Sequence, residues 1–133
     1  MGQEGLERKG VLAVEEDRRI RQLIRVNLEA DGLRVCEAES EHQCLEVFQI
    51  EKCQVLLLSL DTPGLDALRM ARGIRARGGA NLPLLLISAE EPSTALLRAL
   101  QPALYIKRPF DATDLARCVK ELLGGNAGKA LGG

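Results

Sequence analysis

Short runs of apolar residues alternate along the chain with segments whose apolar residues recur every three to four positions. The short runs have the length and uniform hydrophobicity of strands covered on both faces, and the longer segments have the period of helices. We expect strands at 11–14, 33–36, 55–58, 84–87 and 104–106, and helices at 18–30, directly after Ser40, and at 66–76, 93–100 and 112–123.

Several of the expected helix ends carry recognisable signals. Ser40 is a good N-cap for the second helix, and Asp31-Gly32 is a stop signal for the first. The last helix ends at Gly124-Gly125-Asn126. The face of the first helix that we expect to be buried carries Ile20, Leu23, Ile24 and Leu28.

Five strand–helix units in succession predict an α/β fold with a doubly wound parallel sheet. We divide the chain into an N-terminal extension at 1–9, one domain at 10–123 and a Gly-rich flexible tail or linker at 124–133. Right-handed crossovers bring the loops after the strands to one edge of the sheet. A functional site is expected there, at the switch point of the strand order.

Composition excludes some classes of function. The 133 residues have a net charge of −1 and only 2% aromatic residues, which disfavours a nucleic-acid platform or an anionic membrane as the binding partner. The sequence shows neither a signal peptide nor an apolar run of membrane-spanning length, so we expect a cytoplasmic protein. The basic run at 18–21 lies beside Glu15, Glu16 and Asp17, and we interpret it as a solvated helix face.

The cysteines give no indication of a metal site. Their spacing contains no C-x-x-C motif, and the chain has a single histidine, His42. We expect Cys36, Cys44, Cys53 and Cys118 to be reduced and mostly buried.

Polar residues follow four of the five expected strands. They are Glu15-Glu16-Asp17, Ser59 with Asp61, Ser88, and Lys107-Arg108. Acids, hydroxyls and a cation are therefore expected to converge on one edge of the sheet.

Four segments in order resemble the receiver domain of two-component response regulators, over about 10–123. They are "VLAVEEDRRIRQLI", "VLLLSLDTPGLDAL", "PLLLISA" and "YIKRPF". The resemblance implies a flavodoxin-like (βα)5 three-layer sandwich with strand order 2-1-3-4-5. It also implies a role in phosphorelay signal transduction and no enzymatic activity of its own.

The resemblance assigns roles to the residues after the first and third strands. Glu15 and Glu16 would form the acidic pair that holds Mg²⁺ in the family. Ser59, four residues before Pro63, would stand where the family carries its phosphoacceptor aspartate. Asp61 would give a backbone carbonyl to the metal.

The resemblance also assigns roles near the fourth and fifth strands. Ser88 would be the switch hydroxyl and Tyr105 the switch aromatic. The family's lysine falls on Arg108, whereas Lys107 is one residue early and should point the other way by strand alternation. For Ser88 we favour a structural role in which the hydroxyl bonds local backbone.

Ser59 in place of the family's aspartate and Arg108 in place of its lysine weaken the phosphorylation chemistry that the resemblance implies. An aspartate, with a pKa of about 3.9, is anionic at neutral pH, whereas a serine hydroxyl needs a base to become a nucleophile. His42 is expected beside a different strand, so it is a poor candidate for that base. We therefore expect no phosphorylation of Ser59 by the family's chemistry. Asp61 is an alternative acceptor that we disfavour because of its place in the loop.

Arg108 suggests a replacement for the Mg²⁺ ion that the family binds. We hypothesise that Arg108 pairs with Glu15 or Glu16, with an outward-facing Arg108 as the alternative. Loss of one anionic ligand at Ser59 leaves Glu15 and Glu16 as candidates for weak Mg²⁺ binding at best.

We thus predict a pseudo-receiver that acts as a protein-interaction or regulatory module independently of phosphorylation. We expect it to bind a protein partner or a second copy through the face formed by the fourth helix, fifth strand and fifth helix. Two alternatives are the N-terminal regulatory domain of a larger DNA-binding regulator, and a receiver phosphorylated at an unusual acceptor.

Overall fold

A computed structural model describes residues 8–63 and 66–124 of the chain. The predicted tail lies outside the described residues except for Gly124, and only residues 8 and 9 of the predicted N-terminal extension lie within them. The five strands are β1 (Gly10–Val14), β2 (Arg34–Ala38), β3 (Val55–Ser59), β4 (Leu84–Ser88) and β5 (Ala103–Lys107). The five helices are α1 (Arg18–Ala30), α2 (Glu41–Ile50), α3 (Ala67–Ala76), α4 (Thr94–Leu100) and α5 (Ala112–Leu123).

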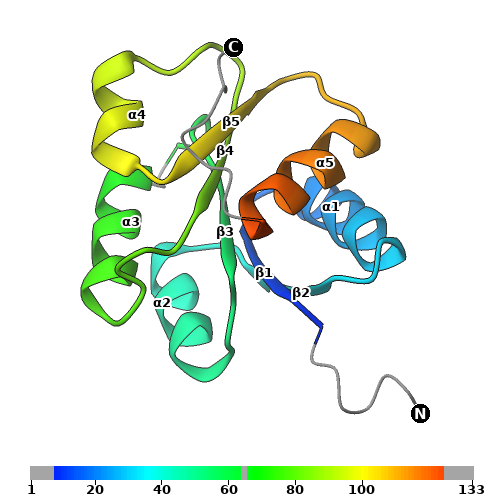
Figure 1. Ribbon diagram of the computed structural model, residues 1–133, viewed down its shortest axis with the longest axis horizontal. Coiled ribbons are helices and arrows are strands. Elements are labelled where there is room, and N and C mark those ends of the chain that lie inside the picture. Colours follow the sequence, from blue (N-terminus) through cyan, green and yellow to red (C-terminus); the bar gives the residue numbers. More distant parts are fainter. Residues whose placement is uncertain (1–7, 64–65, 125–133) are drawn as a thin grey trace.

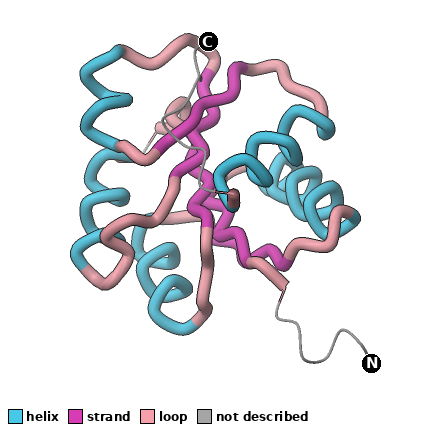
Figure 2. Tube along the Cα trace, viewed as in Figure 1, coloured by secondary structure: helices cyan, strands magenta, loops and turns pink. Residues whose placement is uncertain are grey.

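The strands form one parallel sheet in the order β2-β1-β3-β4-β5. Helices α1 and α5 cover one face, and α2, α3 and α4 cover the other (Figure 1). The tube view shows the same three layers, with the strands between two groups of helices (Figure 2). The predicted doubly wound sheet and its strand order are confirmed.

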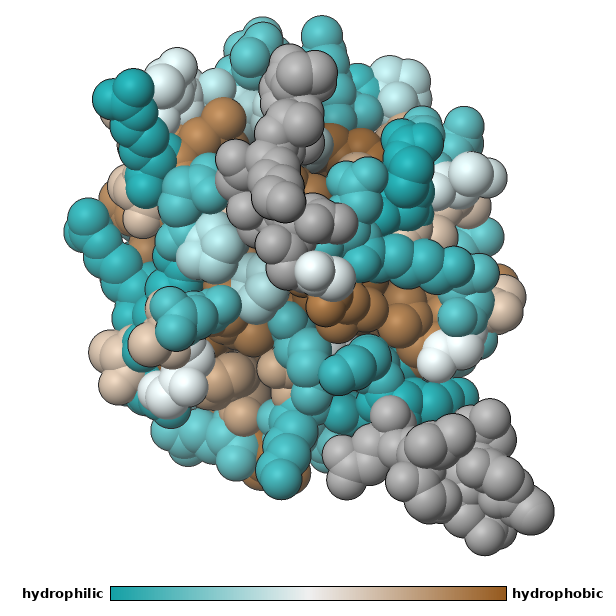
Figure 3. Space-filling model, viewed as in Figure 1, coloured by the Kyte–Doolittle hydropathy of each residue, from teal (hydrophilic) through white to brown (hydrophobic). Residues whose placement is uncertain are grey.

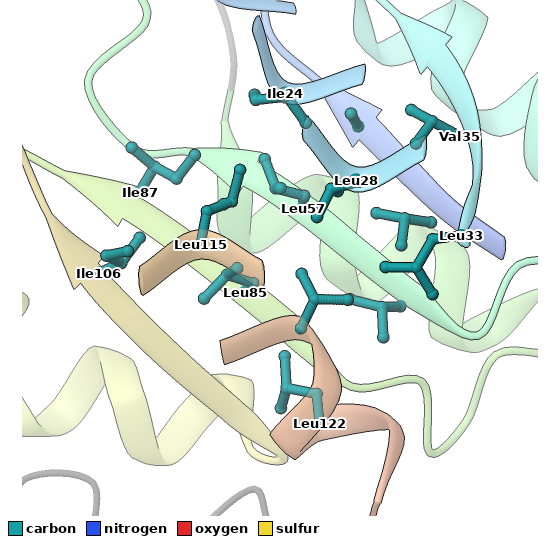
Figure 4. Close-up of a cluster of buried hydrophobic side chains, with 14 of the residues drawn as sticks. Ile24, Leu28, Leu33, Val35, Leu57, Leu85, Ile87, Ile106, Leu115 and Leu122 are labelled. Atoms are coloured by element: carbon teal, nitrogen blue, oxygen red, sulfur yellow. The ribbon is translucent and has the colours of Figure 1, made fainter. Parts of the chain in front are cut away.

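Two hydrophobic clusters lie on opposite faces of the sheet, because neighbouring strand residues point to opposite sides. On the α1–α5 side, Ile24, Leu57 and Leu115 come from a helix, a strand and another helix and point toward one another (Figure 4). All five residues of β1, β3 and β4 are buried. This burial on both sides explains why these strands are apolar without alternation.

The predicted helix signals at the first two helices are found in the structure. The Ser40 side chain accepts a hydrogen bond from the Gln43 N–H and so caps α2. Gly32 has φ of +87°, and its N–H and that of Leu33 bond the last carbonyls of α1. A left-handed residue at this position suits glycine, which has no Cβ to clash.

The buried face of α1 differs from the prediction. Leu23 is 53% exposed, whereas Arg21, Ile24 and Leu28 are the buried residues of this helix. The expectation that Leu23 faces the core is therefore wrong. Arg21 replaces it because the guanidinium finds buried partners, which an apolar count does not reveal.

The surface is mostly hydrophilic on the face seen in Figure 3, with hydrophobic residues in patches between polar ones. Among the described residues, no helix has the length and hydrophobicity needed to cross a membrane. Cys44 is buried and the other three cysteines are half-buried, so the expectation of mostly buried thiols holds fully for Cys44 alone. The four thiols are free.

Candidate functional site

A hollow of about 450 Å³ opens at the carboxyl ends of β1, β3 and β5. The loop after β1 leads to α1 on one face of the sheet, and the loop after β3 leads to α3 on the other face (Figure 1). The two loops therefore diverge and leave space between them. The hollow is lined by Glu15, Glu16, Asp17, Ile20, Ser59, Asp61, Thr62, Pro63 and Arg108. The structure thus gathers most of the polar residues that the sequence placed at the strand ends.

Ser59 is the last residue of β3 and is fully buried. Its hydroxyl oxygen accepts hydrogen bonds from Thr62 Oγ1 at 3.0 Å and from Arg108 Nη2 at 2.9 Å. A guanidinium stays charged at neutral pH and does not take a proton from serine. His42 lies on α2 with its side chain 85% exposed, 3.3 Å from Glu46. Both described hydrogen bonds therefore bring donors to the Ser59 oxygen and hold it in place.

Glu15 and Glu16 point in different directions. Glu15 continues β1 by one residue, since its N–H bonds the Ala38 carbonyl, and it is only 3% exposed. Its carboxylate accepts a bond from the Asp17 N–H at 3.0 Å and faces Arg108 Nη2 at 3.3 Å. Glu16 is exposed at the rim of the hollow. The glutamate that pairs with Arg108 is therefore Glu15.

Arg108 reaches the hollow from the loop after β5. Its Nη2 lies between the Glu15 carboxylate and Ser59 Oγ, and its Nε lies 3.2 Å from Asp61 Oδ2. The side chain is 25% exposed, so the alternative in which it points to solvent is wrong. The Arg108 N–H also bonds the Ser88 carbonyl at 2.9 Å, which fixes where the side chain starts.

The residues around Arg108 do not fit a divalent metal as they stand. Mg²⁺ needs near-octahedral oxygen ligands, and here a guanidinium occupies the space between the Glu15, Ser59 and Asp61 oxygens. Within 8–63 and 66–124, no group of three or more His, Cys, Asp or Glu side chains is placed to hold a metal ion. The positive charge among these oxygens is the guanidinium of Arg108.

Asp61 contributes its carboxylate to the site, whereas only its backbone carbonyl was expected to take part. Its Oδ2 accepts a hydrogen bond from the Ala89 N–H at 2.6 Å and one from Arg108 Nε at 3.2 Å. Thr62 was likewise overlooked, although its hydroxyl contacts Ser59. The signal available in the sequence was the pair of polar residues two and three positions after the end of β3.

Ser88 and Lys107 are the last residues of β4 and β5, and Tyr105 lies in the middle of β5. The Ser88 hydroxyl donates to the Glu90 carbonyl and accepts from the Glu90 N–H, so it bonds local backbone as favoured from the sequence. Tyr105 is half-buried against the cluster on the α2–α4 side. Lys107 is exposed, as strand alternation indicated.

Arg21 holds the backbone of the loop after β1, which carries Glu15 and Glu16. It is 9% exposed, and its Nη1 donates to the Glu15 carbonyl at 2.7 Å and to the Glu16 carbonyl at 3.3 Å. Its Nε pairs with Glu37 at 3.0 Å. The interpretation of 18–21 as a wholly solvated face is therefore wrong at Arg21. Its position three residues before Ile24, in the inward stripe of α1, was the signal for this role.

Glu37 receives hydrogen bonds from both Arg21 and Arg25. Burial works to raise the pKa of Glu37, but the hydrogen bonds from the two arginines outweigh it and lower the pKa below its usual value. The same contact raises the pKa of Arg25. This ion cluster ties α1 to β2, next to the loop that carries Glu15.

Comparisons with known proteins match residues 11–120 to the family described as "Response regulator receiver domain". The Transcriptional regulatory protein CseB of Streptomyces avermitilis is 30% identical over 119 residues, which cover 88% of this chain and 50% of that protein. The chain thus spans about half the length of the curated relatives it matches.

Solved structures agree on the fold. The chemotaxis response regulator CheY4 of Vibrio cholerae has a TM-score of 0.79 at 19% identity, covering 87% of this chain and 99% of that one. The response regulator TrrA of Thermotoga maritima, in complex with Mg²⁺-BeF, has a TM-score of 0.73 at 25% identity, covering 86% of this chain and 98% of that one.

Proposed function

Because the chain belongs to the response regulator receiver family of two-component signalling, we propose that it is a receiver that works without phosphorylation of an aspartate. The observation that carries this proposal is the environment of Ser59. A buried, neutral hydroxyl stands at the tip of β3, and its oxygen accepts bonds from Arg108 and Thr62. Serine attacks a phosphoryl group only when a base removes its proton, and these two neighbours are donors to it.

Arg108 serves in this proposal as an internal cation in place of Mg²⁺. The support is its position between the buried Glu15 carboxylate, Ser59 and Asp61. A planar guanidinium offers several donors in fixed directions and keeps its charge, so it can satisfy these three oxygens at once. Binding of Mg²⁺ to Glu15 would first have to displace this group.

The output of such a receiver is contact with another protein. We place that contact on the face formed by α4, β5 and α5, as the resemblance to receiver domains implies, with either a protein partner or a second copy of the chain as the occupant. Light scattering on the purified protein measures whether a second copy binds. Replacement of the exposed Lys107 by glutamate reverses a charge on this face and should weaken either complex.

A second candidate follows from the length of the relatives. CseB is named as a transcriptional regulatory protein, and this chain covers half of it. The chain would then be the regulatory domain of a longer DNA-binding regulator. The reading frame beyond Gly133 tests this candidate directly, because a following output domain would support it and a stop codon would remove it.

Incubation with acetyl phosphate and Mg²⁺, followed by intact-mass measurement, tests phosphorylation. A receiver with its aspartate intact, treated in parallel, shows that the donor is active. We expect the wild-type chain to gain no phosphoryl group. A stoichiometric phosphoryl adduct would overturn the proposal, and Ser59→Ala and Asp61→Asn variants would then show which side chain carries it.

The variant Ser59→Asp with Arg108→Lys asks whether the lost chemistry depends on these two residues. It supplies a carboxylate at the strand tip and a more flexible cation beside it. We expect this double variant to gain the adduct that the wild type lacks. If the double variant gains no phosphoryl adduct while circular dichroism shows that it is folded, the assignment of these two residues as the cause is contradicted.

A further inference from the structure

The carboxylates of Glu15 and Asp61 each contact a backbone N–H and the Arg108 guanidinium, but among the described contacts only Asp61 receives both on the same oxygen. Its Oδ2 accepts from the Ala89 N–H at 2.6 Å and from Arg108 Nε at 3.2 Å. Hydrogen bonds to a charged oxygen are shorter and about twice as strong as neutral ones. A single oxygen therefore joins two donors that come from different loops.

These contacts connect the three loops that follow β3, β4 and β5. Asp61 lies in the first loop, Ala89 in the second and Arg108 in the third. The Arg108 N–H also bonds the Ser88 carbonyl, and the Leu60 N–H bonds the Ile87 carbonyl. The turn after β4 is thus held from both sides, and Asp61 holds it at the residue directly beyond the strand.

The Ala89 N–H and Arg108 Nε form a convergent pair of donors that is suited to an oxyanion. One donor is a fixed backbone group and the other carries a full positive charge. In this chain the oxyanion is the side chain of Asp61, which is tethered at the site and so is present at a high effective concentration. Its side chain is 37% exposed, so solvent reaches the site once the carboxylate is removed.

We propose that Asp61 is a built-in anion occupying a two-donor anion site made by Ala89 and Arg108, and that it keeps the turn after β4 in one fixed conformation. This inference rests on the proposed function, since two donors that the chain's own carboxylate fills are not open to a transferred phosphoryl group. A transferred phosphoryl group is an anion that comes and goes, whereas the Asp61 carboxylate is permanent. The domain is therefore held in one state by its own sequence.

The test is chemical rescue of Asp61→Ala with acetate, read out by amide hydrogen exchange at Ala89. Loss of the carboxylate removes a charge-assisted bond, so exchange at Ala89 should become about tenfold faster. Sodium acetate should restore protection saturably in this variant, compared with sodium chloride at equal ionic strength. Acetate should leave the wild type unchanged, because its site is filled.

Glu91→Ala is the matched control, because Glu91 is an exposed acid in the same turn. It removes the same charge and should leave exchange at Ala89 at the wild-type rate. Circular dichroism checks that both variants are folded. Asp61→Asn keeps an oxygen acceptor without the charge and should lie between wild type and Asp61→Ala.

Unchanged exchange at Ala89 in Asp61→Ala would overturn the inference. Equal effects of acetate and chloride would also overturn it, since the donors would then form no anion site. These results are separate from those of the phosphorylation test. Labelling of the wild type by acetyl phosphate would end the proposed function while leaving the exchange measurements as they are.

Discussion

Replacing Arg108 with methionine removes the guanidinium that faces Glu15 and Asp61 and keeps an unbranched apolar stem. Glu15 is 3% exposed, and in this variant its carboxylate retains only the bond from the Asp17 N–H among its described partners. Removing one member of a fully buried ion pair costs about 3–5 kcal/mol. Because Arg108 is 25% and Asp61 37% exposed, we expect a smaller loss of about 2–3 kcal/mol in the free energy of unfolding.

The same variant should acquire a response to Mg²⁺. Without the guanidinium, the Glu15 and Asp61 carboxylates face a space that a divalent cation can enter, with water completing its ligands. A ligand that binds only the folded state at tenfold its Kd stabilises that state by about 1.4 kcal/mol. Mg²⁺ should therefore recover about half of the lost stability, whereas the wild type should not respond.

Urea unfolding followed by far-ultraviolet circular dichroism measures both effects, with and without MgCl₂ at constant ionic strength. Lys107→Met is the control, because it removes a neighbouring exposed cation from the same strand end. A loss below about 0.5 kcal/mol for Arg108→Met, which is the usual range for a surface change, would refute the internal-cation reasoning. Equal stabilisation of wild type and variant by Mg²⁺ would refute it as well.

Three further predictions concern the surroundings of the site. Arg21→Met should lower the free energy of unfolding by about 2–3 kcal/mol, because the Glu15 carbonyl and Glu37 lose a buried donor. Urea unfolding measures this loss. A loss no larger than that caused by Arg19→Met, at an exposed position of the same helix, would contradict the prediction. Since the pKa of Glu37 is lower in the folded state than its usual 4.5, its contribution is present above that pH and is lost as the pH falls through the folded pKa. Glu37→Gln should flatten the acid side of the stability–pH curve, and an unchanged slope below pH 4.5 would count against it. Burial raises the pKa of Cys44 to about 12, so a thiol reagent at neutral pH should modify it only after unfolding, and rapid modification of native Cys44, seen by peptide mass mapping, would argue otherwise.

The strands were predictable because their sequence pattern has one cause, whereas their order followed from the resemblance to receiver domains. A strand covered on both faces must be apolar throughout, and β3 and β4 are. The phase of α1 was harder to predict. Leu23 and Arg21 differ by two positions, and hydrophobicity alone puts Leu23 inside. The buried partners of Arg21 come from β2 and the loop after β1, so they exist only after the sheet has formed.

The position of the site followed from the topology, because parallel strands bring their carboxyl ends to one edge of the sheet. Glu15, Ser59 and Arg108 were placed at this edge on that basis. The direction of Asp61 was not predictable in this way. It lies beyond the strand end, where residue alternation no longer applies, and its partner Ala89 offers a backbone N–H that no residue type indicates.

The charges of the hollow explain why the serine and the arginine belong together. Glu15 and Asp61 are two acids on either side of one guanidinium, and the neutral Ser59 hydroxyl adds no further charge. An aspartate at position 59 would place a third carboxylate around a single positive charge, which favours a divalent cation over an arginine. A lysine at position 108 would carry the same charge on a more flexible stem and would lose the geometry that lets one group serve three oxygens. On the proposed function the two residues depend on each other, and we expect metal-dependent phosphorylation only when both are changed.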